Sequence, residues 1–310
     1  MNTNKSHLRI ATRKSALAMW QARHVQALLR DTHAGLEVEL VPIVTQGDRI
    51  LDQPLATIGG KGLFLKELEQ ALLAGTADLA VHSMKDVPAE MAAGLVLDAV
   101  LPRANPYDAL ISRNGEELAG LKAASRVGTS SLRRQAQLLA LRPDLDIKDL
   151  RGNVDTRLRK LGEGQYDAIV LACAGLERLG LDDRISQVLQ PPEFVPASTQ
   201  GIIGLQCREN DSVTRTLIKP LADEATAVVA AAERTVARQL GATCQVPLAV
   251  HAVLEAGVLR LAALIAAPDG ETIFRADGEG GPEDAIALGE RVAAKLMEQG
   301  AGDILSALQH

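Results

Sequence analysis

Short apolar runs alternate with segments of helical period through the first two thirds of the chain. Leu8–Ala11 and Val38–Val44 are mostly apolar runs of strand length, which predicts two buried strands. The segment between them is predicted to be a helix that begins after Ser15, a residue type favoured at the N-cap. One face of this helix is formed at i, i+3, i+7 and i+11 by Leu17, Trp20, His24 and Leu28.

The alternation continues in two series, separated by a break at Pro102 and Pro106. The first series adds a helix around Phe64–Leu72 and strands at Leu79–Val81 and Leu95–Val100. Alternation of this kind favours parallel, doubly wound sheets. The second series consists of strands Ala109–Ile111, Arg126–Gly128, Ile147–Leu150 and Ala168–Ala172, with helices Leu132–Leu141 and Val154–Leu161.

The pattern changes after a second proline-rich break at residues 191–196, which is followed by the strand-like run 201–207. A long helix at Asp223–Leu240 precedes two consecutive strands, Val246–Leu254 and Val258–Ala266. A final helix begins near Pro282. Consecutive strands followed by a helix indicate a small α+β domain, so we expect an α/β protein with two doubly wound domains and a small C-terminal α+β domain.

Composition excludes several classes of protein. The 310 residues carry a net charge of −6 and only six aromatic residues, which argues against a nucleic-acid-binding protein. No apolar run approaches the roughly 18 residues of a membrane span, and the first 15 residues lack the apolar core of a secretory signal. Three scattered cysteines do not form a disulfide framework. These features favour a cytoplasmic protein.

Positive charge is concentrated in one segment. Residues 126–160 contain nine Lys or Arg and four Asp, which gives +5 and leaves −11 for the rest of the chain. Any one of these arginines is more often part of a solvated helix face. However, Arg133 and Arg134 fall in the first turn of a predicted helix, where the helix dipole favours acids. An anion bound at that helix end explains the arrangement, and several such ends together predict a small polyanionic ligand.

Other candidate groups lie at turns. Asp86 and Lys85 follow the strand Leu79–Val81, at the carboxyl end where α/β proteins bind ligands, although a lone carboxylate is more often structural. Cys244 lies in a turn after the long helix, where a thiol is accessible. The glycine-rich segment Gln46–Gly62 is long for a connection, which indicates a lid or an untidy surface loop. The histidines show no metal-ligand spacing, so no metal is expected.

Seven motifs, in order along the chain, resemble the hydroxymethylbilane synthase family, also called the porphobilinogen deaminases. They are RIATRKSALAMWQA, GGKGLFLKELE, DLAVHSMKDVP, VGTSSLRRQAQL, LRGNVDTRL, AGLERLGL and CQVP. The resemblance implies two domains of the type II periplasmic-binding-protein fold and a third domain that carries a cysteine. It places domain 1 at residues 1–101 and 201–220, domain 2 at 106–195 and domain 3 at 223–310.

Members of this family join four porphobilinogen molecules head to tail into hydroxymethylbilane and release ammonia at each step. By resemblance, the growing chain is attached to a dipyrromethane cofactor, which Cys244 holds as a thioether, and Asp86 is the catalytic residue. Residues 242–243 and 198–199 depart from the usual family pattern.

The resemblance also implies individual binding roles. The cofactor carboxylates would be held by Lys85, Ser131, Arg133 and Arg134. The substrate would be held by Arg13, Ser15, Gln21, Thr129, Ser130, Arg151, Arg157, Arg178 and Gln200. Lys61 and Phe64 would belong to the lid.

Two other functions share parts of this pattern. A non-catalytic type II binding module for a small polyanion would have the same arginines but no need of Asp86 or a modified Cys244. A phosphate-ester enzyme would require a metal. The expected partners are a small-molecule substrate, with no nucleic acid and no membrane, and the chain is expected to be a monomer.

Overall fold

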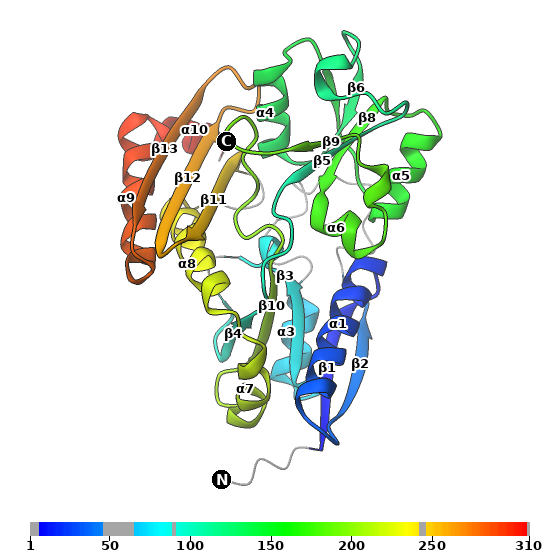
Figure 1. Ribbon diagram of the computed structural model, residues 1–310, viewed down its shortest axis with the longest axis vertical. Coiled ribbons are helices and arrows are strands. Elements are labelled where there is room, and N and C mark those ends of the chain that lie inside the picture. Colours follow the sequence, from blue (N-terminus) through cyan, green and yellow to red (C-terminus); the bar gives the residue numbers. More distant parts are fainter. Residues whose placement is uncertain (1–5, 46–64, 89–90, 242–245, 309–310) are drawn as a thin grey trace. The chain divides into compact units, whose positions relative to one another are not determined.

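The computed structural model describes residues 6–45, 65–88, 91–241 and 246–308 (Figure 1). Contacts divide the chain into two compact units. Unit 1 comprises residues 1–104 and 202–227, and unit 2 comprises residues 105–201 and 228–310. The chain therefore leaves unit 1 after residue 104 and returns to it at residue 202.

A five-stranded mixed sheet forms the centre of unit 1. Its order is β2-β1-β3-β10-β4, with β1 parallel to β2 and β3 and with β10 antiparallel to both of its neighbours. The expectation of entirely parallel strands is therefore wrong, because β10 returns from a distant part of the chain and enters the sheet from the opposite end. The strands are β1 (His7–Arg13), β2 (Glu37–Ile43), β3 (Leu79–Ser83), β4 (Leu95–Val100) and β10 (Ile203–Arg208).

Helices cover both faces of this sheet. On one face, α1 (Ala16–Thr32) and α7 (Ser212–Ile218) share an apolar core with β1 and β3. On the other face, α3 (Lys66–Leu73) packs through Leu68 and Leu72. The predicted N-cap is confirmed, since Ser15 has extended backbone and its hydroxyl accepts a hydrogen bond from the Ala18 amide. Two short 3₁₀ turns complete the unit, Met84–Asp86 and Lys219–Leu221.

The first part of unit 2 is a second five-stranded mixed sheet, in the order β7-β6-β8-β5-β9. The helix α4 (Leu132–Leu141) lies on one face, and α5 (Val154–Gly162) and α6 (Cys173–Arg178) lie on the other. Cys173 is the first residue of α6 and is buried. The strands are β5 (Asp108–Ser112), β6 (Arg126–Gly128), β7 (Asp146–Lys148), β8 (Ala168–Ala172) and β9 (Gln187–Leu189).

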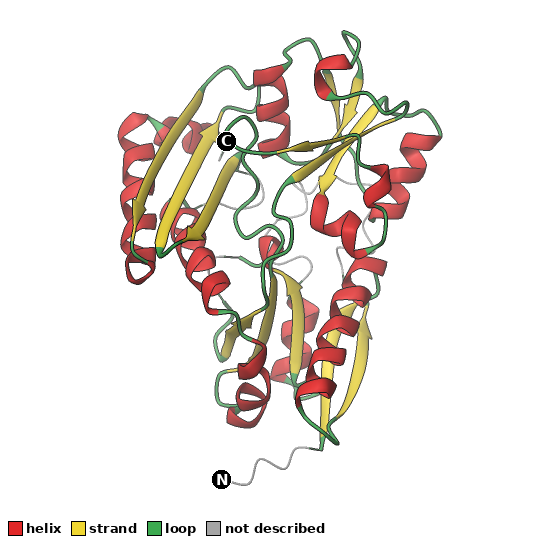
Figure 2. Ribbon diagram, in the orientation of Figure 1, coloured by secondary structure: helices red, strands yellow, loops and turns green. Residues whose placement is uncertain are grey.

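The C-terminal part of unit 2 is a three-stranded antiparallel sheet, in the order β11-β12-β13. Figure 2 shows this sheet with helices on one side of it, and α9 makes the main contacts, with β12 and β13. The elements are α8 (Glu224–Gln239), β11 (Leu248–Glu255), β12 (Val258–Ala266), β13 (Ile273–Gly280), α9 (Ala285–Gln299) and α10 (Ala301–Ala307).

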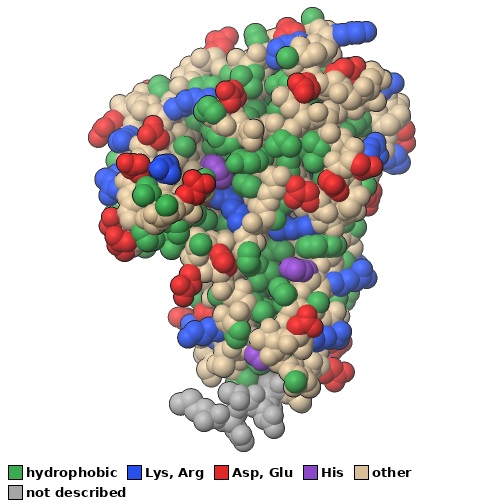
Figure 3. All heavy atoms as spheres, viewed as in Figure 1, with side chains coloured by type: hydrophobic (Ala, Val, Ile, Leu, Met, Phe, Trp, Pro, Cys, Tyr) green, Lys and Arg blue, Asp and Glu red, His purple; other side chains and the backbone are tan. Residues whose placement is uncertain are grey.

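Basic and acidic side chains are interspersed over the face shown in Figure 3. Within the described ranges, no helix combines the length and the apolar character needed to cross a bilayer.

Candidate functional site

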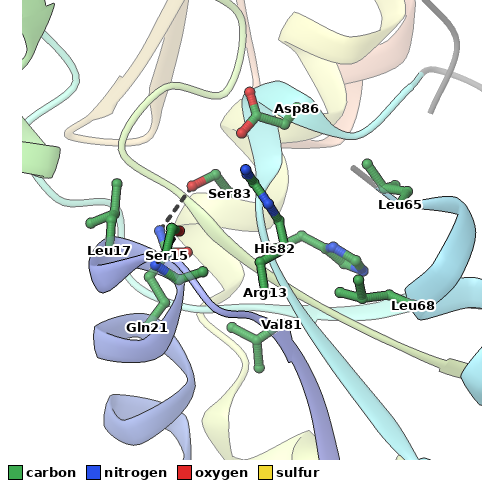
Figure 4. Close-up of a pocket in the computed structure, with 11 residues that line it drawn as sticks. Arg13, Ser15, Leu17, Gln21, Leu65, Leu68, Val81, His82, Ser83 and Asp86 are labelled. Carbon is green, nitrogen blue, oxygen red and sulfur yellow. Dashed lines mark hydrogen bonds between the residues drawn. The ribbon is translucent and has the colours of Figure 1, made fainter. Parts of the chain in front are cut away.

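A pocket opens in unit 1 where the carboxyl ends of two parallel strands meet. Arg13 is the last residue of β1 and Ser83 is the last residue of β3. Ser15 and Gln21 come from α1, and Asp86 comes from the 3₁₀ turn after β3 (Figure 4). Ligands of α/β proteins bind at this edge of the sheet, and these five polar side chains all line the pocket.

Backbone and side-chain hydrogen bonds fix the pocket wall that bears Asp86. The Met84 amide donates to the Ile202 carbonyl at 3.0 Å, and the Val87 amide donates to the Met84 carbonyl at 3.1 Å. The amide of buried Gln21 donates to the Ser83 hydroxyl at 2.9 Å. Asp86 itself is exposed at the rim. The turn thus presents a carboxylate to solvent on a fixed backbone.

A buried polar relay lies behind this wall. Gln206 on β10 donates through its amide nitrogen to a Glu69 carboxylate oxygen at 2.9 Å, so its amide oxygen is the atom that lies 2.8 Å from His82 Nε2. Nε2 must therefore carry the proton. Burial lowers the pKa of His82 to about 4, against the smaller opposing effects of the Gln206 hydrogen bond and the Asp86 charge. His82 is a neutral pocket residue that the sequence analysis did not single out, although it lies within the HSMKD motif.

In unit 2, the turn between β6 and α4 has the predicted form of a helix start. Ser131 is the N-cap of α4 and its hydroxyl accepts from the Arg134 amide. The Thr129 hydroxyl accepts from the Ser131 amide at 3.2 Å, and the Ser130 hydroxyl donates to the Leu150 carbonyl. These three hydroxyls therefore make internal hydrogen bonds that define the turn.

Arg133 and Arg134 turn inward onto one buried carboxylate. Arg133 Nη1 lies 2.8 Å from Asp108 Oδ2, and Arg134 donates to Asp108 Oδ1 through Nε at 2.9 Å and Nη2 at 2.7 Å. Asp108 is fully buried and both arginines are nearly so. Burial lowers the pKa of Arg133, while the charge of Asp108 opposes that effect. Two guanidinium groups share one carboxylate, so these three side chains carry a formal net charge of +1.

Gln200 and Arg178 stabilise the segment that leads back toward unit 1. The Gln200 amide donates to the Pro106 carbonyl at 2.7 Å and to Asp108 Oδ1 at 3.1 Å. Arg178 Nη2 donates to the Gly201 carbonyl at 2.7 Å, and burial lowers the pKa of Arg178 to about 10. Gln200 thus adds a neutral donor to the Asp108 cluster.

The junction between β7 and α5 offers further basic groups. Arg157 Nε donates to the Gly152 carbonyl at 2.7 Å, and Gly152 has a φ of +114°. Arg151 is half-buried, and its Nη1 is one of the buried side-chain atoms in the described ranges that lack a hydrogen-bond partner. A buried guanidinium nitrogen without a partner is costly unless a ligand satisfies it. Planar donors of this kind suit carboxylates.

Some candidate residues lie outside the described ranges. They are Lys61, Phe64 and Cys244, together with the expected lid Gln46–Gly62. Lys85 is described and half-buried, next to Asp86. Burial raises the pKa of Cys173 to about 12 and that of Cys207 to about 11, so both thiols are unreactive. Among the described residues, no group of three or more His, Cys, Asp or Glu is placed to hold a metal ion.

The two mixed sheets with helices on both faces, and the polar side chains at their strand ends, define an α/β protein. Residues 8–216 match the family model described as porphobilinogen deaminase, dipyrromethane cofactor binding domain, and residues 227–298 match the C-terminal domain of the same family. The chain belongs to the porphobilinogen deaminase family, which acts in tetrapyrrole biosynthesis, and it carries that family's dipyrromethane-binding domain.

The chain is also similar to periplasmic and binding proteins of known structure. It shares 16% identity with the VFT2 domain of Bordetella pertussis BvgS, over 69% of this chain and 85% of that chain, with a TM-score of 0.42. With the methionine-binding protein MetQ it shares 15% identity over 68% and 89% of the two chains, with a TM-score of 0.44. It shares 16% identity with the Escherichia coli aliphatic sulphonate binding protein SsuA, over 99% of this chain and 79% of that chain, with a TM-score of 0.40.

The Asp108 cluster predicts a large loss of stability when its carboxylate is removed. Asp108→Asn keeps the side-chain volume but leaves two buried guanidinium groups without a counter-charge, so the free energy of unfolding should fall by about 3–5 kcal/mol. Urea unfolding of both proteins measures this difference. Asp98→Asn, which breaks the more exposed pair between Asp98 and Arg215, is the matched control and should cost much less. Equal losses would contradict the assignment.

The His82 relay predicts a specific pH dependence. Because its pKa is about 4 in the folded protein and 6.5 ordinarily, the unfolded chain binds a proton that the folded protein does not between these values. Stability is therefore unaffected above pH 6.5 and falls as the pH drops through this window, by about 2–3 kcal/mol at pH 4.5.

Urea unfolding of the wild type and His82→Gln at pH 7 and pH 4.5 measures this contribution. The variant should lose less stability on acidification than the wild type. His7→Gln, which removes an exposed histidine, should behave as the wild type does. A His82→Gln protein with the full wild-type loss would show that His82 is already protonated in the folded protein.

Proposed function

We propose that this chain condenses four porphobilinogen molecules head to tail into hydroxymethylbilane, on a dipyrromethane primer that Cys244 holds as a thioether. The observation that carries the proposal is the buried pair Arg133 and Arg134 at the start of α4. These two arginines share the single carboxylate of Asp108. A buried surplus of positive charge calls for an anionic ligand. The acetate and propionate groups of a dipyrromethane are such anions.

The side chains at this helix end suit the carboxylates of a dipyrromethane. Arg133 and Arg134 offer planar guanidinium groups, and Ser131 caps the same helix end. Lys85 adds a cation next to Asp86. We assign the cofactor carboxylates to these four residues.

The reaction needs a carboxylate near the reacting rings. When bound, the dipyrromethane supplies a terminal pyrrole with a free α-carbon. In each condensation, the bond between the methylene carbon and the amino nitrogen of porphobilinogen breaks and ammonia leaves, a carbon–carbon bond forms to that α-carbon, and the α-carbon loses its proton. Asp86 accepts hydrogen bonds from pyrrole N–H groups and stabilises the positive charge that develops when ammonia leaves. Its exposure on a fixed turn supports this role.

The remaining candidate residues bind the incoming substrate. Arg13 and Ser15, with Gln21 behind them, line the pocket beside Asp86. The unpartnered Nη1 of Arg151 supports a carboxylate contact at the start of α5. We assign the other substrate contacts to Thr129, Ser130, Arg157, Arg178 and Gln200, and closure over the site to a lid at Gln46–Gly62 with Lys61 and Phe64. We further propose a cytoplasmic monomer of three domains with the boundaries given above.

A non-catalytic module that binds a small polyanion is the second candidate. The surplus charge at Asp108 favours it as much as it favours the enzyme. The two differ in covalent chemistry, because a binding module needs neither a modified Cys244 nor the carboxylate of Asp86.

The mass of the purified protein tests the attachment site. The wild type should exceed its sequence mass by one dipyrromethane, and Cys244→Ser should lack this excess because it has no sulfur to form the thioether. Intact-mass spectrometry measures both. Cys173→Ser, which changes a buried thiol, is the control and should keep the adduct. A folded wild type without added mass would favour the binding module.

Replacement of Asp86 tests the catalytic role. Asp86→Asn should keep its fold and its adduct, and its kcat should fall by roughly 100- to 10,000-fold, the range typical of a lost acid–base group. Steady-state consumption of porphobilinogen measures the effect, with Asp98→Asn as a control that removes a carboxylate outside the pocket. Turnover within a few-fold of the wild type would refute the assignment.

A further inference from the structure

The turn between β12 and β13 packs directly against the arginine-bearing helix α4. The turn is closed by the Ala267 amide, which donates to the Thr272 carbonyl at 2.8 Å, and Gly270 stands in it with a φ of +76°. A Cβ atom at Gly270 would lie 2.5 Å from the Ala136 carbonyl oxygen and 2.7 Å from the Ala140 nitrogen. Backbone of the turn therefore contacts backbone of the helix, with no room for a side chain.

A hydrogen bond and an apolar cluster reinforce this contact. Gln135 Nε2 donates to the Pro268 carbonyl at 3.1 Å. Ala136 is fully buried in a cluster with Ala249, Leu264 and Ala266, which come from β11 and β12. Figure 1 shows α4 next to the end of this sheet. The turn and α4 are thus one packed assembly inside unit 2.

The same turn is joined to Pro247 and to the start of β11. The Ala266 amide, one residue before the turn, donates to the Pro247 carbonyl at 3.2 Å, and Leu248 pairs with Ile265 in the antiparallel sheet. Pro247 is three residues from Cys244 in the sequence. A short path of backbone contacts therefore runs from Pro247 through the turn to α4.

The point of contact on α4 lies one turn beyond the arginine pair. Arg133, Ala136 and Ala140 are spaced i, i+3 and i+7, so they share one face of the helix. Arg133 and Arg134 are anchored in turn on Asp108. If the turn displaced α4, Arg133 and Arg134 would move with the helix. Their positions relative to Asp108 would change, because Asp108 lies on β5 and would stay in place.

We propose that Gly270 is a positioning residue, which sets the placement of the Arg133–Arg134 pair relative to Pro247 and the strands β11 and β12. The inference rests on the proposed function, in that Cys244 and these arginines hold the same cofactor. Gly270 touches no ligand. Its role is to let the turn approach the α4 backbone closely, and a misplacement of about 1 Å can reduce a rate by about 100-fold.

Gly270→Ala and Gly257→Ala form a matched pair. Gly257 has a φ of +78° in the hairpin between β11 and β12, and nothing lies within 4 Å of its Cβ position. Both alanines carry the same backbone strain, but only Gly270→Ala collides with α4. The unfolding midpoint of Gly257→Ala measures the strain alone.

The first readout is adduct formation, which intact mass follows over time after porphobilinogen is added to unloaded protein. Gly270→Ala should form the adduct about 10- to 100-fold more slowly than the wild type, and Gly257→Ala should stay within two-fold. In the loaded fraction of Gly270→Ala, kcat should fall while the KM for porphobilinogen stays within two-fold, since the pocket of unit 1 is unchanged. A loss of stability alone would not slow adduct formation or split kcat from KM.

Gln135→Ala is the milder second variant, because it removes only the hydrogen bond to Pro268. It should fold, and it should slow adduct formation by about three-fold or more, which keeps the test decisive if Gly270→Ala does not fold. If Gly270→Ala formed the adduct at the wild-type rate, the positioning role would be overturned. If Gly270→Ala did not fold, a wild-type rate of adduct formation in Gln135→Ala would overturn it. Absence of any adduct in the wild type would instead refute the proposed function, so the two failures are distinct.

Discussion

Burial of one carboxylate between two guanidinium groups is the constraint on which unit 2 depends. Asp108 begins β5, and its burial is tolerable only while Arg133 and Arg134 reach it from α4. Gln200 donates to the same carboxylate from the segment that leads back to unit 1. The strand, the helix and the connecting segment are therefore fixed together by their contacts with this one carboxylate.

Unit 1 uses a different device at its own strand ends. There His82 is the buried titratable group, and burial keeps it unprotonated at physiological pH, while Gln206, which also donates to Glu69, fixes the orientation of the ring. The only carboxylate that this wall presents at the pocket is Asp86, and it is exposed.

Local patterns predicted the elements well and the direction of side chains poorly. The bounds of β6 and α4 and the Ser15 cap followed from apolar period and capping chemistry. The strand β13, whose sequence contains two glycines and three charged residues, has too weak an alternation to be recognised. The inward turn of Arg133 could not be predicted either, because its partner Asp108 lies 25 residues away and pairs with it only through the sheet.

The position of β10 has a consequence for how the protein is made. This strand lies between β3 and β4, so β4 has no neighbour in the sheet until residues 203–208 have been added. The ribosome synthesises all five strands of unit 2's first sheet before that point. Domains usually fold in the order of their synthesis. In this chain the sheet of unit 1 instead stays incomplete until β10 has been synthesised, which happens only after the first sheet of unit 2.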